Sequence, residues 1–391
     1  MSAPSIPNLL SLRGGASGRG RGRGRGGPGR SGVPASGPGS GSGASHDATI
    51  QGTDTDAAIS RLSAVELGYL SDPFARLFVQ GPPLSHGVGR RLPIINRGTY
   101  TRTTAIDTLV DRFLATTNPD EPRQIVSLGA GTDTRSLRLF ASQRHRNLAY
   151  HEIDFPAIIA RKQTIIRSSP QLQTLLSPPE PLTQTTWQCH CPSNPNNSNN
   201  DDDDVYGNKN NTLTLHGLDL RHFPPSLPNL APSPPTLLLS ECCLCYLPPS
   251  TSTALIGFFA SFCASSLSLV LYEPILPHDP FGKMMVSNLA ARGITMPTLE
   301  AYPTVADQTR RLREEAGFEQ VRCETVDAIW ERWVSEGEKE RVDRLEGGLD
   351  EVEEWRLLAG HYVVAWGWRG GAGVDLEVDE GGGGGGGGRV D

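Results

Sequence analysis

Residues 124–134, QIVSLGAGTDT, form a short apolar run that ends in two glycines, Gly129 and Gly131. Glycines directly after a buried strand let the backbone approach a ligand closely, as in the turns of nucleotide-binding α/β domains. The third glycine of the dinucleotide fingerprint is missing, because Thr134 stands in its place. Alone, the turn indicates only a nucleotide-like ligand.

Apolar runs of strand length recur along the chain and alternate with helical patterns, as expected of a parallel sheet covered by helices. We expect strands at residues 124–128, 149–153, 213–217, 236–240, 267–272, 319–325 and 361–368. The last two runs alternate or have polar ends, which suits an edge hairpin. The sequence therefore predicts an α/β, Rossmann-like sheet of seven strands, five parallel and a terminal edge pair.

Acidic residues end three of these strands. Asp154 ends the second, Asp219 the third and Glu241 the fourth. Ligands of open α/β sheets lie at the carboxyl ends of strands, where Asp154 can accept hydrogen bonds from both ribose hydroxyls. Each acid alone is also explained as a helix N-cap. Together they favour a cationic sulfonium over a pyrophosphate, and so a class I S-adenosylmethionine-dependent methyltransferase.

The domain boundaries follow from composition. Residues 1–50 are rich in Gly, Ser, Pro and Arg, which predicts a disordered tail, and residues 371–391 are a second, Gly-rich tail. Residues 186–211 contain SNPNNSNNDDDD and suggest a low-complexity insertion in a surface loop. We therefore expect a single methyltransferase domain over residues 51–370, with residues 51–120 forming an N-terminal helical lid.

Charge is distributed unevenly. The net charge of the chain is −7. The residues before His46 carry arginines and no acidic residue, so the negative charge lies entirely in the rest of the chain. Arg and Gly alternate over residues 19–25, a pattern that can contact RNA through phosphates and stacking. We expect a solvated tail without a specific partner, with RNA contact as the alternative.

The seven cysteines follow no secreted framework, and no signal peptide is apparent at the start. This predicts a cytoplasmic location, with the nucleus as a second compartment. No cysteine group supplies four ligands at a recognised spacing, so no metal is expected. The uncharged run at residues 242–272 contains prolines, which favours buried strands and a helix over a membrane span.

Several blocks of the chain resemble, in order, the leucine carboxyl methyltransferase family. The most specific are NRGTYTR at residues 96–102 and YEP with DPFG within residues 272–282. The resemblance spans about residues 54–370. It implies an enzyme that esterifies the C-terminal leucine of the catalytic subunit of protein phosphatase 2A, giving a methyl ester that regulates holoenzyme assembly. It also suggests that residues 327–360 contact the phosphatase body, and we expect a monomer and no membrane partner.

The resemblance implies seven contacts to S-adenosyl-L-methionine: Arg61, Arg102, Gly129, Asp154, Asp219, Leu220 and Glu241. Arg102 resembles the residue that clamps the methionine carboxylate. Asp154 matches the ribose ligand, and Asp219 with Leu220 matches the adenine-binding pair. Arg61 stands where animal members have a lysine, so the charge is kept while the geometry differs.

Three residues are expected to carry catalysis: Arg97, Arg102 and Tyr246. A C-terminal carboxylate is already ionised at neutral pH, so its attack on a methyl group needs no general base. We therefore expect Tyr246 to position the carboxylate together with Arg97 or Arg102.

Other functions fit parts of the sequence. An O-methyltransferase acting on a transfer RNA base or on a small carboxylate would share the glycine and acid pattern. A non-catalytic scaffold that binds RNA through the Arg-Gly tail would need none of the pocket residues.

Overall fold

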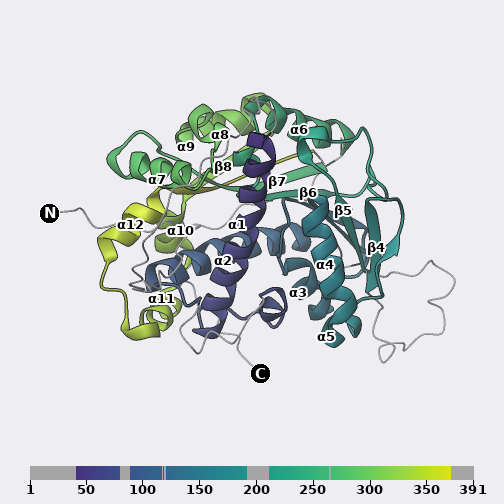
Figure 1. Ribbon diagram of the computed structural model, residues 1–391, viewed down its shortest axis with the longest axis horizontal. Helices are drawn as coiled ribbons and strands as arrows, with labels where there is room; N and C mark the ends of the chain where they lie inside the picture. Colours follow the sequence, from purple (N-terminus) through teal and green to yellow (C-terminus); the bar gives the residue numbers. More distant parts are fainter. Residues whose placement is uncertain are drawn as a thin grey trace, which may run out of the picture.

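The computed structural model describes residues 41–79, 89–116, 118, 120–191, 211–263 and 266–370. A single sheet crosses the molecule, with α2, α3 and α4 on one side and α6 and α9 on the other, while α1 runs in front of it (Figure 1). The strands are β1 (Arg123–Leu128), β2 (Leu148–Asp154), β3 (Glu180–Pro181), β4 (Thr186–Cys191), β5 (Asn211–Gly217), β6 (Thr236–Glu241), β7 (Ser266–Pro274), β8 (Gln320–Thr325) and β9 (Tyr362–Gly370).

The helices lie between and beyond these strands. The α-helices are α1 (Gly41–Glu66), α2 (Pro93–Ala115), α3 (Arg135–Ser142), α4 (Pro156–Ser168), α5 (Pro170–Gln173), α6 (Pro249–Phe262), α7 (Pro280–Ala291), α8 (Pro297–Ala301), α9 (Val305–Arg310), α10 (Val326–Trp333), α11 (Glu336–Asp343) and α12 (Val352–Gly360). The shorter turns are η1 (Ala75–Phe78), η4 (Leu220–His222), η5 (Leu244–Tyr246), η6 (Arg311–Glu315) and η7 (Leu345–Gly347).

The strand order is β3-β4-β5-β2-β1-β6-β7-β9-β8. The five strands from β5 to β7 are parallel, β9 is antiparallel to β7, and β8 is antiparallel to β9. The seven predicted strands are thus confirmed, as is the predicted class I methyltransferase arrangement of five parallel strands and a terminal pair. The hairpin of β3 and β4 extends the sheet beyond the prediction.

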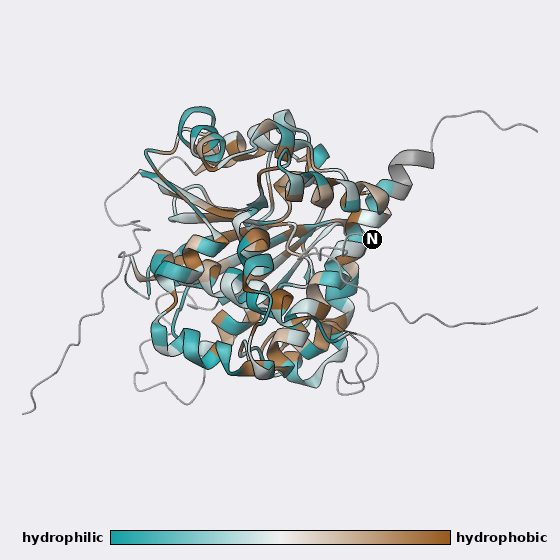
Figure 2. Ribbon diagram, turned by 90° about the vertical axis from the view of Figure 1, so that its left-hand side faces the viewer, coloured by the Kyte–Doolittle hydropathy of each residue, from teal (hydrophilic) through white to brown (hydrophobic). Residues whose placement is uncertain are grey.

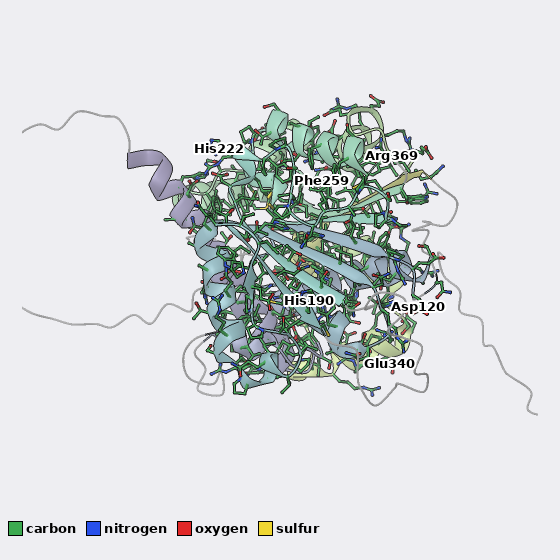
Figure 3. The ribbon with its side chains drawn as sticks, turned by 90° about the vertical axis from the view of Figure 1, so that its right-hand side faces the viewer. Asp120, His190, His222, Phe259, Glu340 and Arg369 are labelled. Atoms are coloured by element: carbon green, nitrogen blue, oxygen red, sulfur yellow. The ribbon has the colours of Figure 1, made fainter. Side chains whose placement is uncertain are left out.

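The parallel strands are buried on both faces because neighbouring side chains point to opposite sides. In β1, Ile125 packs into the core shared with α2, and Val126 packs into the core shared with α6. Figure 2 shows apolar residues between the sheet and its helices, and Figure 3 places Phe259 of α6 in the upper layer. In the described part of the chain, no helix is long and apolar enough to span a membrane.

Two predicted boundaries are wrong. The insertion cannot begin at residue 186, because Thr186–Cys191 form β4, in which Cys189 and Cys191 are buried and pack like small apolar side chains. The tail does not extend to residue 50, because α1 begins at Gly41. Residues 192–210, and the two tails at 1–40 and 371–391 with the Arg-Gly run, lie outside the described residues.

The predicted helical N-terminal region is present, but its two long helices have different surroundings. Helix α2 packs on β7 and β9 and buries Ile106, Leu109 and Phe113, so it belongs to the layer that covers the sheet. Helix α1 instead lies across the carboxyl ends of the parallel strands (Figure 1). The part of residues 51–120 that covers this edge is therefore α1.

Candidate functional site

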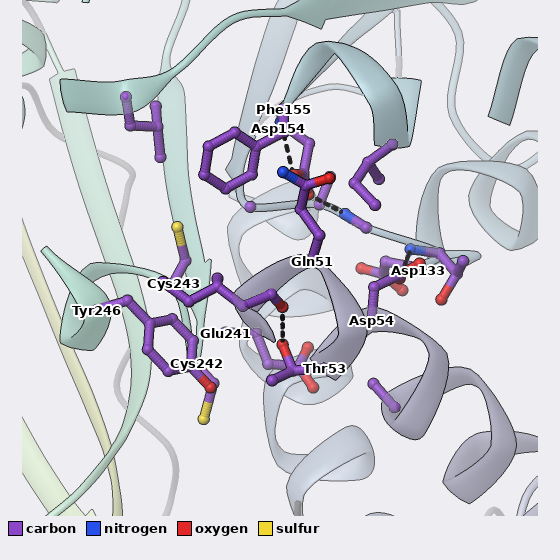
Figure 4. A pocket seen from close by; sticks show the side chains of 18 of the residues that line it. Gln51, Thr53, Asp54, Asp133, Asp154, Phe155, Glu241, Cys242, Cys243 and Tyr246 are labelled. Atoms are coloured by element: carbon purple, nitrogen blue, oxygen red, sulfur yellow. Dashed lines mark hydrogen bonds between the residues drawn. The ribbon is translucent and has the colours of Figure 1, made fainter. Parts of the chain in front are cut away.

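A pocket lies at the carboxyl edge of the parallel strands, beneath α1. Its walls come from α1, from the turn after β1 and from the ends of β2, β5 and β6 (Figure 4). Its charged lining residues, apart from His46, are Asp47, Asp54, Asp133, Asp154, Asp219 and Glu241, with Arg61, Arg102 and Arg221. The carboxylates outnumber the arginines, so the pocket favours a cationic ligand.

The turn after β1 explains why glycines occupy two of its positions. Gly129 has φ +62° and Gly131 has φ +50°, conformations that side chains disfavour. A Cβ at Gly129 would lie 2.6 Å from the Cys243 sulfur, and one at Gly131 would lie 2.6 Å from an Asp54 carboxylate oxygen. The turn therefore requires glycine at both positions, because its backbone conformation and the neighbouring Cys243 and Asp54 leave no room for a side chain.

Asp154 receives two backbone hydrogen bonds at the end of β2. Its Oδ2 accepts from the Gly131 amide at 2.7 Å, and its Oδ1 accepts from the Phe155 amide at 2.7 Å (Figure 4). Burial raises the pKa of Asp154 to about 7, and the neighbouring Asp54 adds to this rise, although the two amides oppose it. The charge of this side chain therefore changes near neutral pH.

Asp219 and Leu220 line the same pocket after β5, where Arg221 joins two acids. The Arg221 guanidinium lies 2.7 Å from Asp219 and 2.7 Å from Asp47 of α1. Burial opposes ionisation of Asp219, but hydrogen bonds from Arg221 outweigh it and lower the pKa of Asp219. Arg221 was not predicted, and it ties the start of α1 to this end of the pocket.

The two predicted cofactor arginines enter the pocket from different helices. Arg102 of α2 forms an ion pair with Glu241, with Nε and Oε1 2.9 Å apart. Burial would lower the pKa of Arg102, but the Glu241 carboxylate reverses this and raises it, so the guanidinium stays charged. Arg61 of α1 donates to the Thr132 carbonyl at 2.9 Å and lies 3.5 Å from Asp133.

Tyr246 lies opposite Asp54 and Asp133 in the pocket (Figure 4). Its buried hydroxyl lies beside the Thr53 side chain and completes no hydrogen bond within the described ranges. Burial raises the pKa of Tyr246 well above its usual value, so the hydroxyl stays protonated. Tyr246 can therefore donate a hydrogen bond to a ligand.

Arg97, also predicted to act in catalysis, does not line the pocket with Arg102. Its guanidinium pairs with Asp343 of α11 and stacks against Trp330 and Trp355. Arg97 precedes Arg102 by five residues, which turns the two side chains about 140° apart around the helix. Arg97 therefore attaches α2 to the C-terminal helices.

Sequence reasoning missed several pocket residues. Asp54 of α1 accepts a hydrogen bond from the Thr132 amide at 2.7 Å, although no motif in the sequence pointed to Asp54 itself. Asp133 faces Arg61 in the pocket. It belongs to the GTDT sequence of the glycine turn, and this position could have identified it as a site residue. Across the described ranges, no group of three or more His, Cys, Asp or Glu is arranged to hold a metal ion.

Comparison with known proteins identifies the family. The model of the family described as leucine carboxyl methyltransferase matches residues 50–260. The chain is 48% identical to leucine carboxyl methyltransferase 1 of Aspergillus fumigatus, over 97% of this chain and 98% of that protein. It is 44% identical to the protein of the same name from Emericella nidulans, over 95% of this chain and 96% of that one.

More distant proteins match as well. The chain is 33% identical to the leucine carboxyl methyltransferase 1 homolog of Arabidopsis thaliana, over 82% of this chain and 90% of that protein. Among solved structures, human N-acetylserotonin methyltransferase in complex with SAM has a TM-score of 0.33 at 10% identity, covering 81% of this chain and 67% of that one. Because the family model matches over half of the chain, and relatives above 40% identity match nearly all of it, the protein belongs to the leucine carboxyl methyltransferase family and is a methyltransferase.

Proposed function

We propose that this protein transfers the methyl group of S-adenosyl-L-methionine to the C-terminal leucine carboxylate of the catalytic subunit of protein phosphatase 2A. The methyl ester would regulate assembly of the phosphatase holoenzyme. The proposal rests on one observation. The same pocket contains a buried, charged Arg102 and a protonated Tyr246 hydroxyl. These groups can bind carboxylates, and this reaction requires no general base.

The described residues fit the cofactor. Gly129 and Gly131 line the pocket in a turn that Cys243 and Asp54 pack against, and the excess of carboxylates complements a sulfonium. Asp154 would accept hydrogen bonds from the ribose hydroxyls, while Asp219 and Leu220 would hold the adenine. Arg102 and Arg61 would hold the methionine carboxylate. When bound, S-adenosyl-L-methionine supplies an electrophilic methyl group on a positively charged sulfur.

The protein's own part in the reaction is to bind and orient. Tyr246 would donate a hydrogen bond to one oxygen of the leucine carboxylate and leave the other free to attack the methyl carbon. Formation of the new C–O bond and loss of the S–C bond remove two opposite charges, so exclusion of water by α1 would favour the reaction. Correct orientation of the reacting groups can contribute up to roughly 7–11 kcal/mol.

The protein surface supports a protein acceptor. Residues 327–360 form α10, η7 and the exposed acidic helices α11 and α12, and we propose that they contact the phosphatase body. The seven described cysteines are free, which supports a reducing compartment such as the cytoplasm, with the nucleus as a second site. We further propose that the protein acts as a monomer.

The test is incubation of the purified protein with methyl-labelled S-adenosyl-L-methionine and four acceptors. These are the phosphatase 2A core enzyme, the same enzyme lacking its terminal leucine, transfer RNA and a small carboxylic acid. The proposal predicts label only on the intact core enzyme. Label on the transfer RNA or on the small acid would show that the enzyme has that substrate instead of the phosphatase. Cofactor binding without any methyl transfer would indicate a non-catalytic scaffold.

A further inference from the structure

We infer that Arg135, which does not line the pocket, is a positioning residue that holds both cofactor arginines, Arg61 and Arg102, in place. The inference rests on the cofactor role proposed above for these two residues. Arg135 is the first residue of α3, and its side chain is only 2% exposed. The residue therefore lies behind the wall of this pocket, out of reach of a ligand bound there.

The Arg135 guanidinium contacts three carboxylates from three elements. Its Nε lies 2.7 Å from Oδ1 of Asp107 on α2. One terminal nitrogen pairs with Asp133 in the glycine turn, and the other lies 3.5 Å from Oε2 of Glu241 at the end of β6. The planar guanidinium suits this role because its donors point in several fixed directions.

Two of these carboxylates reach the pocket arginines with their other oxygen. Asp133 pairs with Arg135 through Oδ2 and lies 3.5 Å from Arg61 through Oδ1. Glu241 faces Arg135 through Oε2 and pairs with Arg102 at 2.9 Å through Oε1. Positive and negative groups thus alternate along a buried chain that starts at one cofactor arginine and ends at the other.

This arrangement predicts how loss of Arg135 would act. Without the central charge, Asp133 and Glu241 would each keep a single cationic partner and would be free to move with it. Arg61 and Arg102 would then lose the fixed positions that a cofactor carboxylate requires. We expect this misplacement to weaken cofactor binding by roughly tenfold to a hundredfold, the loss that follows when a hydrogen bond to a charged group is lost, while binding on the acceptor side, where Tyr246 lies, is unchanged.

Arg138 supplies a matched control on the same helix. It also binds Asp107, with its terminal nitrogens 2.6 Å and 3.1 Å from the two carboxylate oxygens. No hydrogen bond or ion pair joins Arg138 to Asp133 or Glu241 in the described structure. Removing Arg138 therefore removes an arginine–Asp107 pair and leaves the chain to the pocket intact.

The experiment compares Arg135→Gln, Arg135→Lys and Arg138→Gln in the full-length protein. S-adenosyl-L-methionine binding is titrated by calorimetry, the KM for cofactor and for acceptor are measured, and thermal unfolding reports the fold. We expect Arg135→Gln to raise the cofactor Kd by at least about tenfold without changing the acceptor KM. Arg135→Lys should rescue little, because an ammonium group cannot reach three carboxylates. Arg138→Gln should leave the cofactor Kd within about twofold.

Two results would overturn the inference. One is a folded Arg135→Gln or Arg135→Lys variant with wild-type cofactor affinity, and the other is an equal loss of affinity in Arg138→Gln. If Arg135→Gln does not fold, Arg135→Lys, which keeps the buried charge, decides the matter. A wild-type protein that binds no S-adenosyl-L-methionine would instead contradict the proposed function, so the two failures are distinguishable.

Discussion

Two buried histidines, His151 of β2 and His216 of β5, should make the fold sensitive to mild acid. His151 Nδ1 lies 3.1 Å from His216 Nε2, and their rings are stacked with centroids 5.4 Å apart. Burial lowers the pKa of His151 to about 4. Burial and the neighbouring His151 lower the pKa of His216 to about 3. Both rings are therefore neutral in the folded protein at physiological pH.

The size and direction of the effect follow from these pKa values. Unfolded histidine has a pKa of about 6.5, so between pH 6.5 and 4 the unfolded chain binds protons that the folded protein does not. The contribution of these two histidines to stability is therefore full above about pH 6.5 and is lost as the pH drops toward the folded pKa values. At about pH 5, which is about 1.5 units below the unfolded pKa, each histidine contributes a loss of about 2 kcal/mol.

Urea unfolding at about pH 7.5 and pH 5 measures this loss as a difference in the free energy of unfolding. His151→Gln should reduce the difference by about 2 kcal/mol relative to wild type. His222→Gln is the control: its side chain is 83% exposed and lies 3.5 Å from Asp219, and an exposed pair of this kind contributes at most about 1 kcal/mol, so the change should be smaller than for His151→Gln. A His151→Gln protein that loses as much stability in acid as the wild type would refute the reasoning.

Three further predictions concern the pocket. Gly129 has a φ of +62°, and Gly129→Ala would place a Cβ 2.6 Å from the Cys243 sulfur. This variant should lower the free energy of unfolding by at least about 2 kcal/mol and abolish cofactor binding. The control Gly257→Ala, where a Cβ meets nothing within 4 Å, should stabilise α6 by roughly 0.5–1 kcal/mol in thermal unfolding. Since Asp154 has a pKa of about 7, calorimetric cofactor affinity should weaken below that pH in wild type and not in Asp154→Asn. Arg102→Gln should abolish methyl transfer without unfolding the protein. Arg97→Gln should lower the free energy of unfolding by about 1–2 kcal/mol and keep methyl transfer. The opposite pattern, measured by unfolding and by methyl transfer in both variants, would contradict the roles given to Arg102 and Arg97.

The sheet was predictable because its strands leave strong local signals. The runs at Ile125 and Leu238 are apolar on both faces, as parallel central strands must be, and the glycine turn follows the first of them. The start of α1 was not predictable from its own Gly-rich and polar composition. It is held by distant residues, because Asp47 pairs with Arg221 and His46 Nδ1 lies 2.9 Å from the Gly293 carbonyl oxygen.

The site was predictable where chain order fixes it. Asp154, Asp219 and Glu241 each follow a parallel strand, so the fold brings them to one edge. Arg97 could not be separated from Arg102 until the orientation of α2 against the sheet was known. Arg135 was also missed, because its role depends on carboxylates that come from three separate elements.

The most direct test of the account is to locate the transferred methyl group by mass spectrometry of the phosphatase catalytic subunit after reaction. Wild-type protein should place one methyl group on the C-terminal leucine, as an ester released by mild base, and Arg102→Gln protein should place none. A methyl group on another residue, one that survives base, or full transfer by the Arg102→Gln protein would contradict the claim that this pocket esterifies the leucine carboxylate.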